Sequence, residues 1–451
     1  MTQTVPIILK TAILICSKIK SRTRTSHIVQ VEDTTLDVHE QVDDCRRLSA
    51  ELKEHCHNNG ASSLLFNCAM RRALLFTAIH TSIAISRQVA TKNTFSTMQS
   101  LQHVSKNLHL KKSIDFGLPG PENFEVLETM VSSNDLADGA LLIQVLAVSA
   151  DPYLRNSIKI TEGAMNAGTN KQGAIMQGFV SGKVLRSNNP AWIEGDFFAA
   201  HSHFSTVQIV SKESVKGFRK LTGLIEGEHQ ISLGVGILGM PGATAYGGLI
   251  DVLRPLAGET IFVSAAAGAV GGLVGMIAKN VYGCKVIGSC GGPVKCALIK
   301  EKYGFDHAID YKAIPDAKAL IAELKKVAPE GIDMYFESVG GMHFEAAFAS
   351  LRDKGRIAVC GEIAEYSAEH PNLSSISLMR MIYTFQRIEG FVCGPWLRGE
   401  KGDFAADISK WIKEGKVVLQ EESFTDGLEN WPAAFNSLFT GANIGKVVVR
   451  V

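Results

Sequence analysis

The sequence predicts an α/β protein with two domains, a β-rich domain followed by a doubly wound parallel sheet. Between residues 108 and 233, short apolar runs alternate with Gly, Pro, Asn and Asp, a spacing typical of barrel-like β-rich domains. After residues 239–246 the pattern changes to apolar runs that alternate with helix-compatible runs, which is the order of a Rossmann domain. With 451 residues, the chain is long enough for two or three domains.

Six apolar runs in the second region predict parallel strands, because strands that are buried on both faces of a sheet read as continuous apolar sequence. They are residues 261–263, 285–288, 307–310, 332–336, 356–359 and 387–391. Helical patterns lie between most of them, for instance at residues 316–327 and 342–351.

The first of these runs leads into a turn, Ala266-x-Gly268-x-x-Gly271, that opens a helix-compatible run at Ala269. This is a variant of the dinucleotide-binding fingerprint with Ala at its first position. Small residues let the backbone approach a pyrophosphate, and the unpaired N–H groups of a helix N-terminus attract phosphates. Such a pattern alone is equally typical of a tight turn. Its place after a strand, and before a helix and a second strand, favours cofactor binding.

The segment that follows favours NADPH over NADH. An NAD site carries an acid about 20 residues beyond the fingerprint, where it accepts hydrogen bonds from the ribose. Residues 285–300 contain no Asp or Glu, and they offer Ser289, Gly291, Gly292 and Lys295 instead. Without the acid a 2′-phosphate is not repelled, and the lysine supplies a cation for it. The alternative is that Lys295 is a solvated helix residue.

The end of the chain returns to strand-rich sequence, which can complete the first domain. Beyond residue 395 we expect a helix at 404–414, a strand at 416–420, a helix at 430–439 and a terminal strand at 446–451. The predicted parts are an N-terminal extension at 1–97, a β-rich domain at 98–235 completed by 396–451, and a cofactor domain at 236–395.

The N-terminal extension shows no cofactor or catalytic pattern, and we expect it to be dispensable for catalysis. Residues 55–114 contain no Asp or Glu, and the part that begins at Met70 is rich in Ser and Thr and carries Arg71, Arg72 and Arg87. This composition is typical of organellar transit peptides and also of poorly structured extensions. The expected location is cytoplasmic, or mitochondrial if translation starts at Met70, and Met98 is a second candidate start.

The net charge and the apolar runs of the sequence favour small molecules as binding partners over nucleic acids or membranes. A net charge of +1 gives no electrostatic basis for binding nucleic acid or a membrane surface. No apolar run approaches the roughly 18 residues of a membrane helix. The nine cysteines are scattered without a C-x-x-C pair, as expected for reduced thiols inside a cell.

Zinc is not expected. A zinc alcohol dehydrogenase needs Cys, His and acidic ligands around its catalytic metal. Residues 110–233 contain no cysteine, and His201 and His203 have no thiolate partner nearby in the sequence.

Several motifs together resemble the medium-chain dehydrogenase/reductase superfamily. They are residues 239–246, 263–271, 335–341 (Tyr-Phe-Glu-Ser-Val-Gly-Gly) and 355–361. Asp151-Pro152-Tyr153-Leu154-Arg155 is similar to its zinc-free branch of prostaglandin reductases, also called leukotriene B4 12-hydroxydehydrogenases, and NADP-dependent alkenal double-bond reductases. Over residues 110–451 the resemblance implies a GroES-like β-rich catalytic domain and a Rossmann domain. It also implies NADPH-dependent reduction of the carbon–carbon double bond of α,β-unsaturated aldehydes or ketones, including 15-oxo-prostaglandin types.

The resemblance further implies roles for particular residues. The pyrophosphate is held by Gly268, Ala269, Val270 and Gly271, and the 2′-phosphate end by Lys295 and Tyr311. The other cofactor contacts are Ser338, Cys360, Gly361, Ile363, Tyr366, Phe391, Val392, Cys393 and Asn443. Ser338 stands where the family usually carries Asn; it keeps hydrogen-bonding capacity but is shorter.

The resemblance also implies that Tyr366 lies near the substrate and is the catalytic residue, a role that the cofactor ribose hydroxyl could share. It could also be an ordinary loop tyrosine. Tyr153 and Arg155 are expected to line or support the substrate cleft, or to serve domain geometry alone. Two other functions stay open, a quinone oxidoreductase of the same superfamily and a non-catalytic nucleotide-binding protein. Related enzymes are often homodimers.

Overall fold

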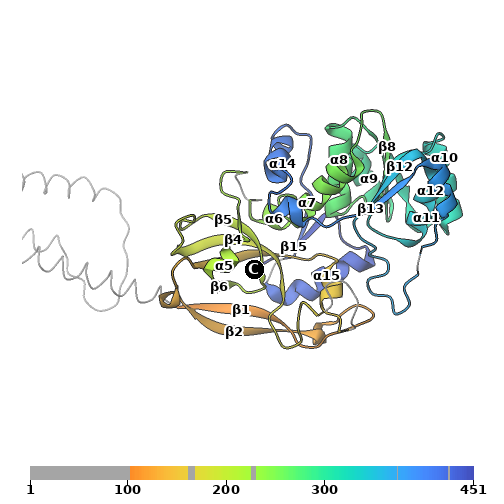
Figure 1. Cartoon of the computed structure of the whole chain (residues 1–451). Coiled ribbons are helices and arrows are strands. Elements are labelled where there is room, and N and C mark those ends of the chain that lie inside the picture. Colours follow the sequence, from red (N-terminus) through yellow and green to blue (C-terminus); the bar gives the residue numbers. More distant parts are fainter. Residues whose placement is uncertain (1–101, 161–167, 225–229, 373, 425–426) are drawn as a thin grey trace, which may run out of the picture. The chain divides into compact units, whose positions relative to one another are not determined.

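The computed structural model describes residues 102–160, 168–224, 230–372, 374–424 and 427–451 (Figure 1). The predicted extension at 1–97, with its candidate start sites, lies outside these residues. Within them, no helix is both long enough and apolar enough to cross a membrane.

The first part of the fold is antiparallel. Strands β1 (Gln102–Leu110) and β2 (Phe124–Ser132) form a two-stranded sheet. A seven-stranded sheet has the order β14-β15-β3-β4-β5-β7, with β6 also paired to β3. Its members are β3 (Leu141–Ser149), β4 (Gln177–Ser187), β5 (Phe197–His203), β6 (Val207–Val210), β7 (Arg219–Lys220), β14 (Glu421–Phe424) and β15 (Lys446–Arg450). The last strand of the chain therefore pairs with β3, about 300 residues earlier.

The second part is a parallel sheet of six strands in the order β10-β9-β8-β11-β12-β13. The strands are β8 (Thr260–Val263), β9 (Lys285–Cys290), β10 (His307–Asp310), β11 (Ile332–Glu337), β12 (Leu351–Val359) and β13 (Arg387–Gly390). This is the Rossmann order, in which the chain starts in the centre, runs to one edge and then fills the other side. The predicted fold class is confirmed, and each of the six predicted runs contributes a strand.

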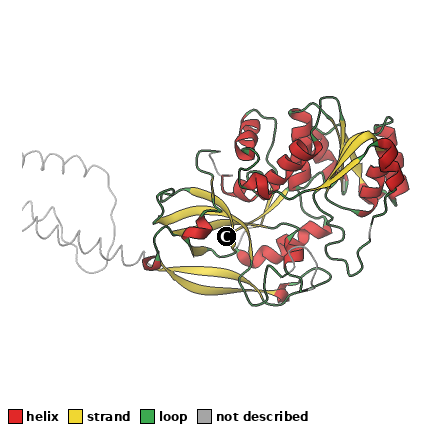
Figure 2. Cartoon of the chain, viewed as in Figure 1, coloured by secondary structure: helices red, strands yellow, loops and turns green. Residues whose placement is uncertain are grey.

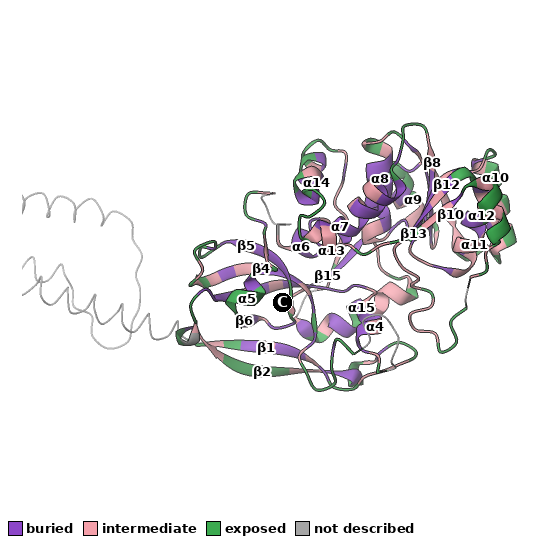
Figure 3. Ribbon diagram, viewed as in Figure 1, coloured by how far each residue is buried: buried purple, intermediate pink, exposed green. Residues whose placement is uncertain are grey.

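Helices cover both faces of the parallel sheet (Figures 1 and 2). One face packs on α7 (Met240–Tyr246), the π-helix η3 (Gly247–Leu253), α8 (Ala269–Asn280) and α9 (Pro293–Glu301), and the other on α10 (Ala317–Val327), α11 (Gly341–Ser350) and α12 (Leu378–Thr384). Successive residues of β8 show the two faces, because Ile261 and Val263 belong to the first core and Phe262 to the second. Figure 3 shows the buried strands between half-exposed helices.

The remaining helices are short or lie near the C-terminus. They are η1 (Pro121–Asn123), η2 (Ser133–Asp135), α4 (Leu154–Ser157), α5 (Lys212–Val215), α6 (Gln230–Val235), η4 (Tyr311–Ala313), α13 (Gly394–Leu397), α14 (Phe404–Lys413), η5 (Leu428–Asn430) and α15 (Trp431–Thr440). The strand predicted at 416–420 is wrong, because the strand begins at Glu421. The amides of Lys416 and Val417, three and four residues beyond the end of α14, still donate to the carbonyl of Trp411. The start of this segment therefore closes the helix and does not pair with a strand.

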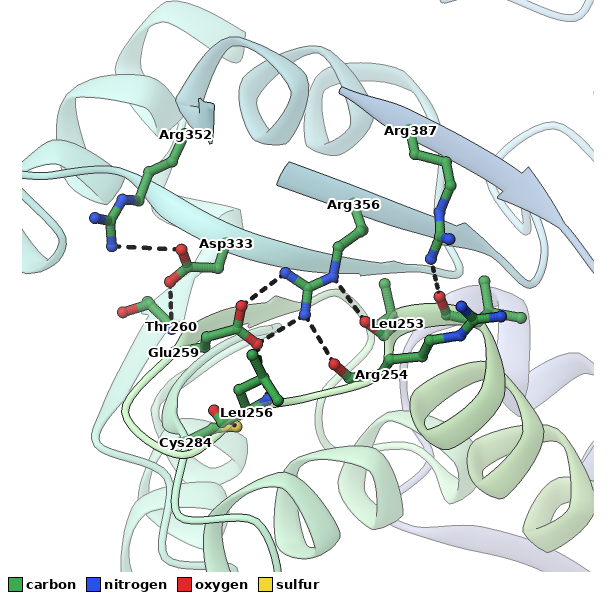
Figure 4. A network of polar contacts seen from close by, with 11 residues as sticks. Leu253, Arg254, Leu256, Glu259, Thr260, Cys284, Asp333, Arg352, Arg356 and Arg387 are labelled. Carbon is green, nitrogen blue, oxygen red and sulfur yellow. Dashed lines mark hydrogen bonds and ion pairs between the residues drawn. The ribbon is translucent and has the colours of Figure 1, made fainter. Parts of the chain in front are cut away.

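A half-buried arginine, Arg356, fixes the entrance to β8 (Figure 4). The guanidinium of Arg356 makes two 2.7 Å hydrogen bonds to the Glu259 carboxylate and donates to the carbonyl oxygens of Leu253 and Arg254. Such a bidentate ion pair holds two groups in one plane. It ties the loop before β8 to β12, and so fixes the strand from which the cofactor turn starts.

Candidate active site

The turn between β8 and α8 lies at the carboxyl end of the central strand, where Rossmann folds bind ligands. Gly268 is the N-cap of α8 and has an extended backbone. A Cβ on Gly271 would lie 2.5 Å from the carbonyl oxygen of Ala265, so only glycine lets the helix begin this close to the strand. Ala265 itself has φ 48, in the left-handed region. The backbone therefore forms a cradle at the start of α8, where the first amides, including those of Ala269 and Val270, can bind an anion.

Two cations and a tyrosine gather at the end of β9. Lys295 Nζ donates to the carbonyl oxygen of Gly441 at 2.8 Å, and burial and the neighbouring Lys312 lower its pKa. The Tyr311 ring and the Lys312 side chain close over Gly291, where a Cβ would meet them at 3.1 and 2.9 Å. Lys312 was missed from the sequence, although it follows Tyr311 directly in the η4 turn.

Asp310, at the end of β10, is already engaged by backbone amides. Asp310 Oδ1 accepts hydrogen bonds from the amides of Gly292 and Lys312 at 2.8 and 3.0 Å. The position where an NAD site carries its acid is filled by Ser289 and Cys290 at the end of β9. The residues present therefore fit the 2′-phosphate of NADPH.

The segment before the last strand lies against the cofactor turn. The amide of Gly445 donates to the carbonyl of Ala267 at 2.8 Å, and Gly445 and Gly268 form an isolated bridge. Asn443 Nδ2 donates to the carbonyl oxygen of Gly445 at 3.3 Å. Asn443 is thus placed beside the predicted pyrophosphate site.

The other predicted cofactor residues follow the carboxyl ends of β11, β12 and β13. They are Ser338, then Cys360, Gly361, Ile363 and Tyr366, then Phe391, Val392 and Cys393. The Ser338 hydroxyl is buried and has no partner in hydrogen-bonding geometry among the described residues. It neighbours the Cys360 thiol, whose pKa burial raises to about 12. An unpaired buried hydroxyl at this edge fits a polar ligand group.

Tyr366 folds back over its own loop. Its hydroxyl accepts a hydrogen bond from the amide of Glu362 at 3.4 Å, and a Cβ on Gly361 would lie 2.8 Å from it. Burial raises the pKa of the phenol above its ordinary value. The phenol therefore keeps its proton at neutral pH and can donate it.

Tyr153, the N-cap of α4, presents a second phenol. Its hydroxyl is buried without a partner among the described residues. Burial raises its pKa well above the ordinary value, and Asp151 and Cys393 add to the shift. The fold thus brings Tyr153 close to the segment after β13, which sequence spacing alone does not show.

Arg155 supports the site from behind. It is fully buried, and its Nε and Nη1 donate to the carbonyl oxygens of Gly117 at 2.8 Å and Ile114 at 3.0 Å. The amide of Gly117 in turn donates to the carbonyl of Ser367, next to Tyr366. These contacts hold backbone near Tyr366, and both predicted roles of Arg155, support of the cleft and domain geometry alone, remain predictions.

Lys446, at the start of β15, was missed from the sequence and lies in a buried ionic network. Its Nζ contacts Asp151 Oδ1 at 3.0 Å, Ser149 Oγ at 2.7 Å and the carbonyl oxygen of Ala150 at 2.9 Å. Only 6% of Lys446 and 3% of Asp151 are exposed. Gly445, the residue before Lys446, binds the cofactor turn, and Asp151 precedes Tyr153 by two residues. The Lys446–Asp151 ion pair therefore connects the cofactor turn with the segment that carries Tyr153. The sequence offered one signal of this buried position, because Lys446 directly precedes a run of three valines in a predicted strand.

The described residues contain no group of three or more His, Cys, Asp or Glu side chains placed to hold a metal ion. The two histidines considered as zinc ligands from the sequence are His201 and His203. His203 Nε2 lies 3.2 Å from Gln177 Nε2, and burial lowers the pKa of both imidazoles.

The fold combines a glycine turn at the centre of a Rossmann sheet with an antiparallel domain that the last strand completes. Together these two features define a medium-chain dehydrogenase/reductase. Residues 106–218 match a family model described as the N-terminal domain of oxidoreductase, and residues 269–413 match one described as zinc-binding dehydrogenase. The chain belongs to the prostaglandin reductase and alkenal double-bond reductase branch of this superfamily.

Relatives and a solved structure each cover about three quarters of the chain. Prostaglandin reductase 1 of Bos taurus is 38% identical over 346 residues, 77% of this chain and 99% of the relative. The NADP(+)-dependent 2-alkenal reductase of Nicotiana tabacum is 36% identical over 356 residues, 78% of this chain and 98% of the relative. The crystal structure of CurA from Vibrio vulnificus in complex with NADPH superposes with a TM-score of 0.67 at 33% identity, covering 77% of this chain and 99% of that one.

Proposed function

We propose that this protein reduces the carbon–carbon double bond of α,β-unsaturated aldehydes and ketones with NADPH. The relatives include prostaglandin reductase 1, the NADPH-dependent curcumin reductase of Escherichia coli (36% identical) and the (+)-pulegone reductase of Mentha piperita (36% identical). The observation that carries the proposal is a cofactor cradle with two cations at one end and two protonated phenols near the other.

The residues divide the work between binding and proton supply. The α8 amides and Lys295 bind the cofactor phosphates, and Tyr311 and Lys312 cover the 2′-phosphate. When bound, NADPH supplies a hydride for the β-carbon of the substrate. Charge then develops on the carbonyl oxygen, so a donor aimed at that oxygen lowers the barrier. Tyr366 and Tyr153 carry their protons on Oη at neutral pH, and we assign the catalytic donor to Tyr366 and substrate placement to Tyr153.

The test follows NADPH absorbance with a medium-chain 2-alkenal and a matched enone, and records product mass. We expect the saturated carbonyl, faster turnover with NADPH than with NADH, and slow turnover of a simple quinone. Turnover of quinone alone would assign the protein to the quinone oxidoreductases. Absence of both NADPH binding and turnover would assign it a non-catalytic role.

We also propose the domain limits predicted from the sequence, with 98–235 and 396–451 on the substrate side and 236–395 on the cofactor side. Pairing of β15 with β3 supports this division. Residues 1–97 are then dispensable, so a chain that starts at Met98 should keep the kcat of the full chain. A folded truncated protein without activity would contradict the proposal.

A homodimer is proposed through α12 and β13. In the described part of the chain, β13 is an edge strand of the parallel sheet, and beside it Leu378, Ile382, Tyr383 and Phe385 are each more than 60% exposed. An edge strand with apolar neighbours is a surface that a second copy can extend. Sedimentation should show a dimer that Ile382→Asp converts to a monomer. A monomeric unmodified protein would contradict this.

We propose a cytoplasmic location, or a mitochondrial one if translation starts at Met70. Fractionation of cells expressing the full coding sequence, with N-terminal sequencing of the product, decides between them.

A further inference from the structure

Two thiols lie in contact beside the 2′-phosphate site. Cys290 is the last residue of β9, and Cys296 lies in the first turns of α9. Their Sγ atoms are 3.6 Å apart. A disulfide needs about 2.05 Å, so the two sulfur atoms have only about 1.5 Å to travel.

The two thiols differ in a way that suits an ordered exchange reaction. Cys296 is half-buried, whereas Cys290 is 3% exposed. Burial raises the pKa of Cys296, but the thiol of Cys290 and the nearby Lys300 oppose that shift. Burial and Cys296 raise the pKa of Cys290 further. Cys296 is therefore the first thiol to ionise and meet a reagent, and Cys290 is the resolving thiol behind it.

We propose that Cys290 and Cys296 form a reversible intramolecular disulfide whose formation weakens NADPH binding. The oxidant class is a small-molecule disulfide such as oxidised glutathione. The Cys296 thiolate attacks one sulfur of that disulfide, forming a mixed disulfide and releasing one glutathione thiolate. Cys290 loses its proton and attacks Cys296 Sγ, which releases the second glutathione. Two protein thiols lose two protons and two electrons, and one glutathione disulfide becomes two thiols.

The loop that this bond would close carries the phosphate-binding residues. It contains Gly291, Gly292 and Lys295, and Gly292 is the N-cap of α9 with φ 87. Lys295 precedes Cys296 directly, and its Nζ is held on the carbonyl of Gly441. Drawing the start of α9 toward β9 therefore moves the ammonium that faces the 2′-phosphate. Loss of one charge-assisted contact predicts about tenfold weaker NADPH binding.

Linkage requires the reverse effect as well. A ligand that binds the dithiol form more tightly must protect that form from oxidation. Saturating NADPH should therefore slow or prevent disulfide formation. Because thiolate is the reacting species and the pKa of both thiols is raised, oxidation should accelerate as the pH rises above neutral.

The test treats the full chain with oxidised glutathione at mildly alkaline pH, blocks free thiols, and digests with trypsin. Cleavage after Lys285, Lys295 and Lys300 places the two cysteines on separate peptides, 286–295 and 296–300. We expect these peptides to be joined by a disulfide, to separate on reduction, and to remain unjoined when NADPH saturates the protein. NADPH fluorescence titration of the oxidised protein should give a Kd about tenfold higher.

Cys296→Ser is the matched control, because it removes the partner thiol with little change of volume. Its Kd for NADPH should not respond to the oxidant. Three results would each overturn the inference. They are two peptides that are blocked separately, a stable glutathione adduct on Cys296, and disulfide-joined peptides with an unchanged Kd for NADPH. The functional consequence rests on the proposed NADPH-dependent reduction. Alkenal turnover by the reduced protein is measured separately, so a failure of that function is distinguishable from a failure of the disulfide.

Discussion

The two ends of the cofactor cleft are built in different ways. The phosphate end is built mainly from two short continuous segments, the turn that contains Gly268 and Gly271 and the run from Cys290 to Lys295, each at the end of one strand. Tyr311 and Lys312 after β10 and the segment before β15 add contacts to these two segments. The nicotinamide end collects residues from the ends of β11, β12 and β13, from α4 and from the last strand. Local segments can be recognised by spacing, whereas an end assembled from distant segments depends on contacts that only the fold creates. The following substitutions test this difference.

The largest effect is expected at Lys446, where the two ends are joined. Lys446→Met leaves Asp151 buried without its cation, and breaking a buried pair typically costs about 3–5 kcal/mol of unfolding free energy. Urea unfolding measures this loss. Because the network also holds the turn that carries Tyr153, the KM for the alkenal should rise in the protein that remains folded.

Arg450→Met is the control for Lys446, since it removes an ion pair from the other end of the same strand. Arg450 contacts Glu421 at 2.8 Å, but its side chain is 34% exposed. Such a pair contributes about 1 kcal/mol or less. Equal losses in the two variants would show that Lys446 has no special role, and addition of Asp151→Asn to Lys446→Met should recover part of its loss.

The second prediction concerns the catalytic proton at the nicotinamide end. Tyr366→Phe should lower kcat about 100-fold, the usual contribution of a positioned proton donor, with little change in the KM for NADPH. The raised pKa of Tyr366 sets the pH dependence. The phenol is protonated below that pKa, so kcat should stay constant through neutral pH and fall only at alkaline pH above the ordinary value of about 10.

Steady-state kinetics across pH check this assignment. The Tyr366→Phe variant should lose the alkaline fall together with its rate. Tyr153→Phe provides the comparison, because we expect it to raise the KM for the alkenal more than it lowers kcat. If Tyr153→Phe loses the rate and Tyr366→Phe does not, the two roles are exchanged.

The sequence was sufficient for the parallel sheet because each strand is a short, local apolar run. At the phosphate end the prediction rests on glycine spacing and a missing acid, which are local signals, and it missed Lys312. It failed at residues 416–420, where the chain completes α14 before it pairs with β15. It did not reveal Lys446 or the buried position of Arg155, because their partners lie 295 and 38 residues away. Composition could not foresee the contact of Cys290 with Cys296, which depends on how α9 leaves β9.

The third prediction tests the phosphate end. Lys295→Ala should raise the KM for NADPH about tenfold and leave the KM for NADH nearly unchanged, since only NADPH has the 2′-phosphate. Lys312→Ala should have the same sign and a smaller effect, because Lys312 is more exposed. An equal rise for both cofactors would mean that Lys295 acts through the helix position instead of the phosphate.

The smallest effect is expected at Ser338, where the resemblance predicts Asn. Its buried hydroxyl has no partner in hydrogen-bonding geometry among the described residues, so a bound cofactor can provide one. One neutral hydrogen bond contributes about 0.5–1.5 kcal/mol, which predicts about threefold weaker NADPH binding in Ser338→Ala. Ser338→Asn, with the longer amide that the resemblance predicts at this position, should bind NADPH as tightly as the unmodified protein or somewhat more tightly. Fluorescence titration measures both, and thermal unfolding separates binding from misfolding. If Asn binds less tightly than Ala while the protein remains equally stable, the space beside Cys360 is too small for the amide, and the nicotinamide end of this protein differs in shape from that of its relatives.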